Sequence, residues 1–579
     1  MSAAVFVWLA ASFARGSGDV QWSGLDAALA RSRAENKPIY VLACAPLNEL
    51  CRATLDALRR PETAEFFNRH FVCVLLDRDA RPDFAAAAQR YLREVKQMPG
   101  WPAQLWLTPQ GEPYDGANYL PPGEEWGKKS LSEIARADAE AWEHQPAACR
   151  RQARAALALL RGRAPALQTK AESVDALAAE GFAAWNNQYD SAHPGFGPPP
   201  RYPEPELLRA MLARGGADRQ RALAALRWLA ASAVRDPLDG GFFRYAQDAG
   251  GALPYPQKLL SDQARLALAY LDAQAVRPEA VFAGAARGAI RYVLTTLARP
   301  DGLFALAQDG TDPRWTAFYA WKAADVARIL GRRAGAFEAA FSVSPAGNVP
   351  ADADPSGQYA GLNLLRRSAG LIPPAGEGEL AADEAALLAA RRVRGALPED
   401  NRAEAAANGL FLSALVRAAE VLRDGHYAGE ARRLGAGMKR SFLTSGGDVR
   451  RFAGQDDPGQ PADYAAMALG FRMLDQARLA AAAEISERLI RRCDRLYLIP
   501  DGGGYAAAAE PLAPGVFIRA PAFLLADHEP APEALALLAA PPPGVQALLL
   551  QALARRAASG SISGDTLLAL GSPSAAPGR

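Results

Sequence analysis

The fold is decided first by Pro38-Ile39-Tyr40-Val41-Leu42-Ala43, a short and continuous apolar run that predicts a buried strand. Working outward, an amphipathic pattern over residues 24–36 predicts a helix before this strand, and residues 61–69 predict a helix after it. Two more buried strands are predicted at residues 71–77 and 103–107. Buried strands that alternate with helices are typical of an α/β domain.

A second helix is predicted directly after the first strand, and the junction reads Pro46-Leu47-Asn48-Glu49-Leu50-Cys51-Arg52. In a thioredoxin fold this junction carries the chemistry, because the helix N-terminus stabilises a thiolate and a second cysteine resolves the mixed disulfide. Only Cys51 is left here, and a position one turn inside the helix would make it a poor attacking thiol. Glu49 would disfavour a thiolate further.

Cys44 is the only sequence-near partner for Cys51. The C-x6-C spacing is not a redox signature, and a disulfide requires Cα atoms within about 7 Å of each other. We therefore expect structural, inert cysteines. The stretch Met98-Pro99-Gly100-Trp101-Pro102-Ala103 resembles the loop that carries a cis-proline facing the redox site, which makes Pro102 the candidate cis residue and Trp101 its neighbour.

Beyond Cys149 the sequence changes to Ala/Leu/Arg-rich helical segments separated by Gly/Pro/Asp loops. The polar, Pro-containing residues 143–148 predict a linker between a domain of residues 21–145 and an all-α domain of residues 150–579. The clearest helices are expected at residues 217–234, 259–273, 278–298, 383–394, 404–423, 462–476 and 477–492.

These helices come in pairs, and glycine-rich turns with an aromatic residue recur after them at residues 239–243, 301–304 and 501–505. The recurrence predicts helical hairpins that close into an (α/α)6 toroid, whose loops on one face build a pocket. The expected protein is therefore multidomain, with an α/β thioredoxin-like domain followed by a six-hairpin barrel.

Composition excludes several classes of function. The 579 residues carry a net charge of +2 with 50% hydrophobic and 22% charged residues, so ordered globular domains are expected. Basic residues are spread among acidic ones, which argues against nucleic-acid binding. The five cysteines lack paired spacing, so we expect no disulfide scaffold, no metal site and no cofactor.

The N-terminal residues 1–20 begin with an apolar run that ends in Ser12-Phe13-Ala14, which fits a signal-peptidase site but lacks a basic region before it. A signal peptide and an N-terminal extension both fit, so a cytoplasmic and an exported protein stay open. The run is too short to cross a bilayer, and we expect no transmembrane segment.

Ordered motifs along most of the chain resemble the spermatogenesis-associated protein 20 family, also called the YyaL-like thioredoxin-domain proteins. The matching segments are 36–39, 71–74, 77–83, 100–102, 107–111, 118–122, 195–197, 236–245, 258–264, 318–321, 408–410 and 463–465. The resemblance implies a thioredoxin-like domain followed by a barrel similar to those of N-acylglucosamine epimerases and six-hairpin glycosidases.

The departures from the family pattern concern its chemistry. Asn48, Glu49, Leu50, Cys51 and Arg52 stand where the family carries Cys-His-Trp-Cys-His, so only Cys51 carries over. The family's Pro-His-Phe-Glu-Lys-Met-Leu appears as residues 254–260 without its His and Glu, and its Asp-Asp-Lys and Trp-Asn-Gly appear as residues 400–402 and 407–409. The chain looks like a divergent member with a degraded CxxC motif.

Candidate catalytic groups in the barrel are few. Epimerases of this type depend on facing histidines, and the five present lie in or beside expected strands, linkers and loops: His70, His144, His193, His426 and His528. A glycosidase would need two carboxylates across a cleft. Most candidates are turn formers or helix caps, namely Asp190, Asp236, Asp239, Asp309 and Asp463, while Asp262 and Asp400 are the exceptions that the family motifs place near the barrel mouth.

Aromatic side chains near that mouth could stack on a sugar ring or pack in the core: Phe242, Phe243, Tyr245, Tyr255, Phe318, Tyr319 and Trp321. The family motifs add Lys258, Asn408 and Asp463 as binding candidates. We therefore expect a carbohydrate-pocket protein; if it is an enzyme, a sugar isomerase, epimerase or glycosidase is preferred over a disulfide reductase. A thiol-disulfide oxidoreductase using Cys51, and a catalytically silent module that binds a protein partner, stay as alternatives.

Overall fold

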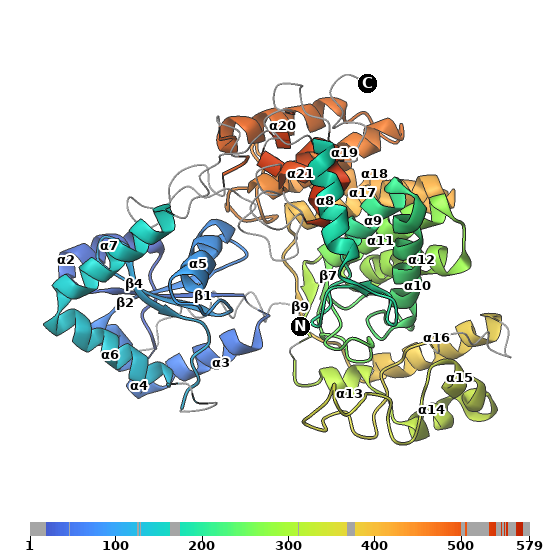
Figure 1. Cartoon of the computed structure of the whole chain (residues 1–579), viewed down its shortest axis with the longest axis horizontal. Helices are drawn as coiled ribbons and strands as arrows, with labels where there is room; N and C mark the ends of the chain where they lie inside the picture. Colours follow the sequence, from blue (N-terminus) through green and yellow to red (C-terminus); the bar gives the residue numbers. More distant parts are fainter. Residues whose placement is uncertain are drawn as a thin grey trace. The chain divides into compact units, whose positions relative to one another are not determined.

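The chain divides into two compact units, one built mainly from residues 19–162 and one mainly from residue 174 onward (Figure 1). The computed structural model describes residues 19–45, 47–123, 127, 129–162, 174–310, 312–367, 377–499, 504–506, 532–539, 546, 549, 550, 552, 553 and 563–570. Residues 1–18 of the expected signal peptide or extension (residues 1–20) and residues 501–503 of the expected turn (residues 501–505) lie outside the described residues.

The first unit holds a mixed four-stranded sheet in the order β2-β1-β3-β4. β1 runs parallel to β2, and β3 is antiparallel to both β1 and β4. The three predicted strands are confirmed to within one residue, and β4 is an addition. The strands are β1 (Ile39–Cys44), β2 (Val72–Asp77), β3 (Ala103–Leu107) and β4 (Pro113–Ala117).

Alternating side chains of β1 enter two cores on opposite faces of the sheet. Tyr40 and Leu42 join a core with α3 (Glu49–Leu58), α4 (Pro61–His70) and α6 (Leu131–His144). Ile39 and Val41 join a second core with α2 (Leu25–Glu35) and α5 (Pro82–Glu94). The unit is therefore a three-layer α/β/α domain, with helices on both faces of the sheet (Figure 1).

The residues expected as an interdomain linker instead join two helices. α6 ends at His144 and α7 (Pro146–Gly162) begins two residues later. α7 packs on β4 and supplies Cys149 and Ala153 to one core and Leu160 to the other. The first unit therefore extends beyond residues 143–148, because α7 buries its apolar side chains against the thioredoxin-like sheet.

The second unit is mostly helical, as expected, and its described helices include a closed ring. α9, α11, α17, α19, α21 and α23 each contact the next, and α23 returns to α9. α8 packs against α23 and α10 against α9, while α12 contacts α11 and α17, and α18 contacts α17 and α19. The predicted all-α toroid is confirmed. Its helices are α8 (Val174–Asn186), α9 (Pro205–Arg214), α10 (Gly216–Ala231), α11 (Leu260–Val276), α12 (Ala280–Thr296), α17 (Ala405–Leu422), α18 (Gly425–Phe442), α19 (Pro461–Gln476), α20 (Ala483–Tyr497), α21 (Pro532–Leu538) and α23 (Gly564–Leu570).

Among the described helices, α17 alone is long and apolar enough to cross a membrane by length and composition, and 67% of its apolar window is buried inside the protein. This helix is also the one that contacts both α11 and α19 in the ring. Its apolar character therefore matches its place in the core of the toroid.

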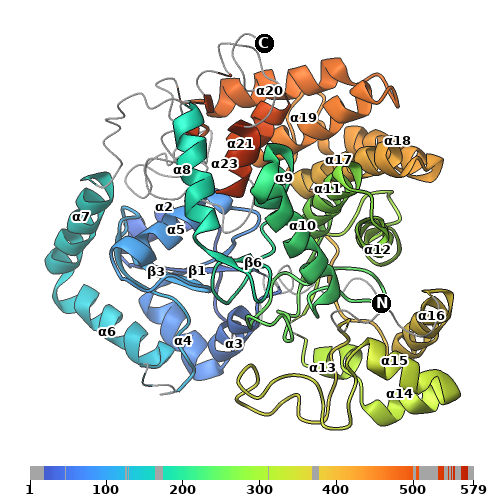
Figure 2. The same ribbon diagram turned by 45° about the vertical axis from the view of Figure 1, so that its right-hand side comes forward.

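An insertion interrupts the toroid between α12 and α17. It contains α13 (Trp315–Tyr319), α14 (Ala323–Leu330), the 3-10 turn η1 (Gly331–Arg333), α15 (Ala334–Ala340) and α16 (Glu377–Val393). α14, α15 and α16 share a separate hydrophobic core around Phe337 and Leu387, and they lie together at one side of the helical unit (Figure 2). Periodicity predicted only α16 of this group.

The loops that precede the ring helices are pinned by polar side chains from those helices. Gln263 of α11 donates to and accepts from the backbone of Phe242, at 2.7 Å each. Asn408 of α17 does the same for Phe304, at 3.0 and 3.1 Å. The Tyr464 hydroxyl of α19 accepts from the Val449 N–H at 3.1 Å. Each loop closes with a short bridge, such as Arg235 with Phe242 and Ala298 with Phe304, so the recurrent turns are one repeated structural unit.

A strand pair and a small three-stranded sheet complete the described part of the unit. β5 (Tyr189–Asp190) pairs with β6 (Gly195–Phe196), and β7 (Lys258–Leu259), β8 (Ala307–Gln308) and β9 (Glu399–Asp400) form a three-stranded sheet. β7 leads directly into α11, and β9 lies shortly before α17. This small sheet therefore lies at the N-terminal ends of two neighbouring ring helices.

Candidate functional site

The sheet β7-β8-β9 brings three polar side chains into one row. Lys258 pairs with Gln308, and Gln308 pairs with Glu399, in antiparallel registers. Residues directly opposite each other in antiparallel strands project from the same face, so these three side chains share a face. Asp400 projects from the other face of β9.

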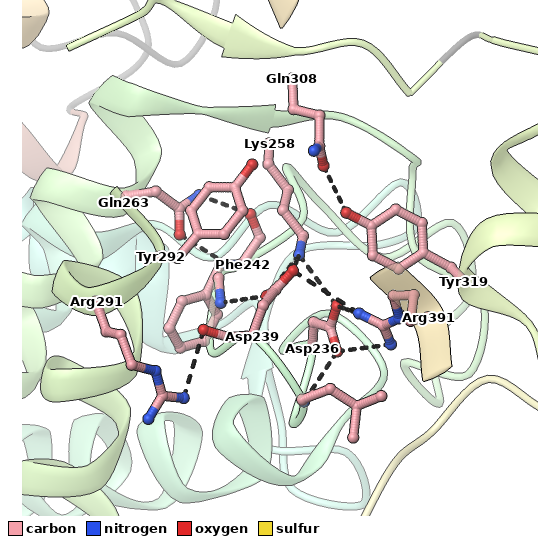
Figure 3. A network of polar contacts seen from close by, with 12 residues as sticks. Asp236, Asp239, Phe242, Lys258, Gln263, Arg291, Tyr292, Gln308, Tyr319 and Arg391 are labelled. Atoms are coloured by element: carbon pink, nitrogen blue, oxygen red, sulfur yellow. Dashed lines mark hydrogen bonds and ion pairs between the residues drawn. The ribbon is translucent and has the colours of Figure 1, made fainter. Parts of the chain in front are cut away.

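Lys258 is the centre of a buried ion network (Figure 3). Its Nζ lies 2.9 Å from both carboxylate oxygens of Asp239 and 3.2 Å from Oδ2 of Asp236. Arg391 of α16 binds Asp236 through both terminal nitrogens, with Nη2 at 3.2 Å from Oδ1. Its Nη1 also lies 3.7 Å from Asp239. Two acids and two bases balance, which is the arrangement that a buried charge cluster requires.

Three aromatic rings surround the Lys258 ammonium. It lies 4.6 Å from the ring centroids of Phe243 and Tyr292 and 4.8 Å from that of Tyr319, distances at which cations are attracted to ring faces. The Tyr319 hydroxyl donates to Oε1 of Gln308 at 2.5 Å. The network therefore ties the insertion, through Tyr319 and Arg391, to β7 and β8 of the toroid (Figure 3).

The turn that carries the two aspartates depends on two glycines. Asp236 accepts from the N–H of Leu238 at 3.0 Å, and Asp239 accepts from that of Gly241 at 2.9 Å. Gly240 has φ +92°, and a Cβ there would lie 2.5 Å from Cα of Gly288. A Cβ on Gly241 would lie 2.6 Å from Cγ of Tyr292. Both glycines are needed because the turn packs directly against α12.

The two aspartates have opposite pKa shifts. Burial would raise the pKa of Asp236, but the charges of Arg391 and Lys258 outweigh it and hold that pKa well below its usual value. Burial and the charge of Asp236 raise the pKa of Asp239 despite Lys258 and Arg391. Asp236 is therefore the fixed anion of the network, and Asp239 is the carboxyl that takes up a proton more readily.

Glu399 is half-buried at the end of the polar row, and burial raises its pKa to about 7. The neighbouring Tyr292 is fully buried; burial, followed by the charges of Asp239 and Glu399, raises its pKa. Within the described part of the chain the Tyr292 hydroxyl has no hydrogen-bond partner. The site thus combines a carboxyl that changes protonation near neutral pH with a buried hydroxyl that can still donate or accept.

Of the aromatic candidates, Phe243 and Tyr319 lie against the Lys258 ammonium. Phe318 packs beside Arg391, whose guanidinium lies 5.9 Å from its ring centroid. Trp321 is fully buried in the core of the insertion, with the Arg394 guanidinium 3.7 Å from one ring centroid. Tyr255 is partly exposed and stacks on Tyr245 at 4.6 Å and 14°.

Four polar candidates are held by structural contacts. Asp262 lies 3.7 Å from Arg265, and Asp400 binds Arg402 through several hydrogen bonds of 2.5–3.1 Å. Asn408 pins the Phe304 loop, and Asp463 accepts from the N–H groups of Gln460 and Ala406 and from Arg451. These contacts are typical of structural residues, and the catalytic role of Asp262 and Asp400 stays a prediction.

In the first unit, the Trp101–Pro102 peptide bond is cis, as the sequence predicts. Trp101 is half-buried, and the Arg78 guanidinium lies 4.8 Å from its ring centroid. Cys51 is 1% exposed in the first turn of α3, where Asn48 caps the helix by accepting from the Cys51 N–H at 2.9 Å. Cys51 is therefore shielded from solvent, and its weak reactivity stays a prediction.

Sequence reasoning named Lys258 and Tyr319 but missed Gln308, Arg391, Tyr292 and Glu399. It considered Asp236 and Asp239 and interpreted them as turn formers, which they also are. No local signal identifies Glu399, because its neighbours in the row come from strands 91 and 141 residues earlier in the chain. Among the residues that the structure describes, no group of three or more His, Cys, Asp or Glu side chains is placed to hold a metal ion.

Comparison with known proteins agrees with this architecture. Residues 15–161 match the Thioredox_DsbH family model, which is described as a protein of unknown function, DUF255. The chain is 26% identical over 541 residues to spermatogenesis-associated protein 20 of Mus musculus, covering 84% of this chain and 68% of that protein. The human protein of the same name is 26% identical over 544 residues. The chain is therefore similar to spermatogenesis-associated protein 20 over most of its length.

Solved structures similar to this chain include two sugar enzymes. One is a D-mannose isomerase, at TM-score 0.39 and 14% identity over 69% of this chain and 86% of that one. Another is the cellobiose 2-epimerase from Bacillus thermoamylovorans, at TM-score 0.36 and 11% identity over 58% of this chain and 74% of that one.

Proposed function

We propose that the helical unit binds a small carbohydrate beside the sheet β7-β8-β9 and that Glu399 transfers a proton on it, in an isomerase-like or epimerase-like reaction. The observation that carries this proposal is the half-buried Glu399 carboxyl, whose pKa of about 7 makes it half ionised at neutral pH. General acid–base catalysis is most efficient when the catalytic pKa lies near the operating pH.

The other charged groups of the site are suited to hold Glu399 and a ligand in place. Lys258 and Arg391 are 1% and 2% exposed and pair with the two aspartates, so their side chains are held in place by the network. The Gln308 amide and the Tyr292 hydroxyl, beside Glu399, offer the neutral hydrogen-bonding groups that recognise sugar hydroxyls.

A carbohydrate is the preferred ligand for two reasons. The family resemblance implies a barrel similar to those of N-acylglucosamine epimerases. In addition, Tyr202, Tyr245 and Tyr255 form a partly exposed stack with centroid spacings of 4.6 Å, and this stack ends three residues before Lys258. Aromatic faces of this kind line many small-molecule sites.

The first unit, in this proposal, does not work as a CxxC oxidoreductase. Asn48 stands where the family's first cysteine is expected, and its side chain is used to cap α3. We assign the thioredoxin-like unit the role of a folded partner domain to the toroid.

The test is hydrogen exchange on candidate sugars. The purified full-length chain is incubated in D2O with aldoses, ketoses, N-acylhexosamines and β-linked disaccharides, and deuterium uptake at carbon is followed by NMR. We expect uptake with one sugar class, a bell-shaped or sigmoidal pH profile with a midpoint near 7, and at least a 100-fold slower rate in Glu399→Gln.

A matched control is Glu384→Gln, which changes a carboxyl of α16 that is also half-buried, also has a raised pKa and pairs with Arg367 at 3.3 Å. This variant should keep the wild-type rate. If Asp262→Asn or Asp400→Asn lost deuterium uptake while Glu399→Gln kept it, the catalytic carboxylates would be those predicted from the sequence. Absence of uptake and of any sugar-induced rise in Tm would support a silent interaction module.

A further inference from the structure

Three arginines lie where the loop after α10 packs on α12. Arg287 and Arg291 belong to α12, are exposed and lie one helical turn apart. Arg235 comes from the loop, and its Nη2 lies 3.5 Å from the Gly284 carbonyl oxygen of α12. Gly284, Arg287 and Arg291 are spaced i, i+3 and i+7, so they share one face of the helix. The three guanidinium groups therefore belong to one small area of the surface.

Printed contacts on both sides of this area hold the loop and the helix together. A Cβ on Gly288 would lie 3.3 Å from Nη2 of Arg235, so the glycine leaves room for that guanidinium. Arg291 donates through Nη2 to the Asp239 carbonyl oxygen at 3.4 Å (Figure 3). Figure 3 shows Arg291 and Lys258 reaching Asp239 from different sides. The arginines are therefore separate from the buried ion network around Lys258.

The three arginines carry charge that no carboxylate neutralises directly. Among the residues that the structure describes, none of the three forms an ion pair with an aspartate or glutamate. Arg235 is half-buried, its Nε is buried without a hydrogen-bond partner, and its bond to the Gly284 carbonyl is long. A partly desolvated cation without a counter-charge is costly, and a bound anion would remove that cost.

Neighbouring charges add to the excess. Burial lowers the pKa of Arg235, and so do the charges of Arg367 and Arg291, while Tyr270 and Glu384 oppose this effect. Glu384 is already paired with Arg367 at 3.3 Å. An arginine keeps its proton even when its pKa is lowered, so the charge of Arg235 persists at neutral pH.

The space over Gly284 is open. This residue is exposed, and a Cβ there would meet nothing within 4 Å. The open space lies beside Nη2 of Arg235 and one helical turn from Arg287. A small anion can therefore approach α12 at this point without displacing a side chain of the helix.

We propose that Arg235, Arg287 and Arg291 bind the phosphate group of a small phosphorylated molecule over Gly284 of α12. The inference does not depend on the carbohydrate proposed beside β7-β8-β9.

The chemistry of the site favours a phosphate monoester. Guanidinium groups bind phosphate oxygens through paired N–H donors, and three of them match the three terminal oxygens of a dianion better than they match one carboxylate. From residue 284 to residue 291 the helix rises by only about 10 Å. One phosphate group fits this length, whereas a nucleic acid is bound through a longer row of phosphate contacts.

The test is isothermal titration calorimetry on the full-length protein with inorganic phosphate, glycerol 3-phosphate and glycerol. The pH is held at 7, and sodium chloride keeps the ionic strength constant, so that general screening is the same in every titration. We expect saturable binding of the two phosphates and none of glycerol. Both phosphates should also raise the Tm, because they bind the native state.

Single arginine variants test the three proposed contacts. Arg235→Gln, Arg287→Gln and Arg291→Gln should each raise the Kd for glycerol 3-phosphate at least fivefold, because each loses a charged donor. Arg332→Gln is the control: it changes an exposed arginine of η1 that has no ion pair among the described residues, and its Kd should stay within twofold of the wild-type value. Because Arg287 is exposed, Arg287→Gln keeps the test informative if Arg235→Gln does not fold.

A fourth variant places a carboxylate in the proposed site. Gly284→Glu should raise the Kd at least tenfold, because its side chain would compete for the same guanidinium groups. Gly429→Glu is matched to it, since Gly429 is also an exposed glycine inside a helix with nothing within 4 Å of an added Cβ, and it should bind as the wild type does.

Three results would overturn the proposal. The first is the absence of saturable phosphate binding by the folded wild-type protein. The second is binding that Gly284→Glu and Arg287→Gln leave unchanged. The third is a 20-base-pair DNA duplex that binds more tightly than glycerol 3-phosphate and loses affinity in the same variants, which would identify a surface for a polyanion.

Discussion

Asp138 lies on α6, where its buried carboxyl interacts with that of Asp115 on β4. Burial and the neighbouring Asp115 raise its pKa to about 8, and Lys96, which pairs with Asp115, opposes this rise only in part. Between about pH 4 and pH 8 the native state therefore holds a proton that the unfolded chain has released. Stability must fall as pH rises through that range.

We expect Asp138→Asn to remove most of this pH dependence, because the amide is neutral at every pH. Between pH 5 and pH 9 the free energy of unfolding falls in both proteins or in the wild type alone. The fall should be smaller in the variant by on the order of 3 kcal/mol. Urea unfolding at the two pH values measures the difference. Asp56→Asn changes an exposed aspartate of the same unit and should leave the wild-type pH dependence in place; an equal effect of both variants would contradict the assignment.

The aspartates of the Lys258 network offer a second comparison between single residues. Asp236 is the fixed anion, bound by Arg391 and Lys258, and Asp239 has a raised pKa. Asp236→Asn should therefore cost about 3–5 kcal/mol, the usual effect of removing one partner of a buried ion pair, and Asp239→Asn should cost roughly 1–2 kcal/mol. Urea unfolding at pH 7 measures both, and the reverse order would show that Asp239 is the essential anion.

For single residues, the sequence predicted some members of the site but not the residues that contact them. Lys258 and Tyr319 were found because they lie in recognisable segments, and Pro102 was found because the loop before a strand is local information. Glu399 and Arg391 could not be found, since their roles come from β9 and α16, far from Lys258 along the chain. Burial of charge, which sets the pKa of Glu399, exists only after these segments pack together.

Among the elements, α17 and α19 approach each other at glycines. A Cβ on Gly409 would lie 2.7 Å from the Ala466 backbone, and one on Gly470 would lie 2.8 Å from the Gly409 carbonyl oxygen. Backbone atoms cannot give way as a flexible side chain can, so an added methyl group must separate the two helices.

We expect Gly409→Ala to destabilise the protein by about 2–4 kcal/mol, because the overpacking strain exceeds the gain in helix propensity. Gly429→Ala is the matched control: this glycine lies inside α18 on an exposed surface, and an added Cβ would meet nothing within 4 Å. That variant should be more stable than the wild type by about 0.5–1 kcal/mol. Urea unfolding measures the free energy of unfolding of both variants. Equal changes in the two variants would show that the α17–α19 contact adapts to the added methyl group without strain.

The elements that the sequence predicted are the ones with strong local patterns. β1 and β3 are continuous apolar runs, and α17 and α19 carry long apolar periodicities. β4 was missed because Pro113, Asp115 and Gly116 are poor strand formers, and it becomes a strand only by pairing with β3. α7 was missed because the polar, Pro-containing pattern of residues 143–148 fits both a linker and the start of a helix. In the structure Pro146 lies in the first turn of α7.

At the scale of the whole molecule, the two units have separate hydrophobic cores. The sheet of the first unit is enclosed by its own helices, and the toroid closes on itself from α9 to α23. The change of sequence character near residue 149 was enough to predict two domains, because an α/β pattern and a long series of amphipathic helices cannot share one layered core. The exact boundary needed the structure, since α7 has the composition of the second unit and the packing of the first.

Separate cores predict separate unfolding. Because each unit buries its own apolar side chains, urea should unfold the chain in two steps, and peptides of the two units should lose protection from hydrogen exchange at different concentrations. Gly409→Ala should move only the step reported by peptides of α17 and α19. Asp138→Asn, at pH 9, should move only the step reported by β1 and β3. If either variant moved both steps together, the free energies of the two units would be coupled, and the thioredoxin-like unit would have to be treated as part of the toroid's folding and of any chemistry at Glu399.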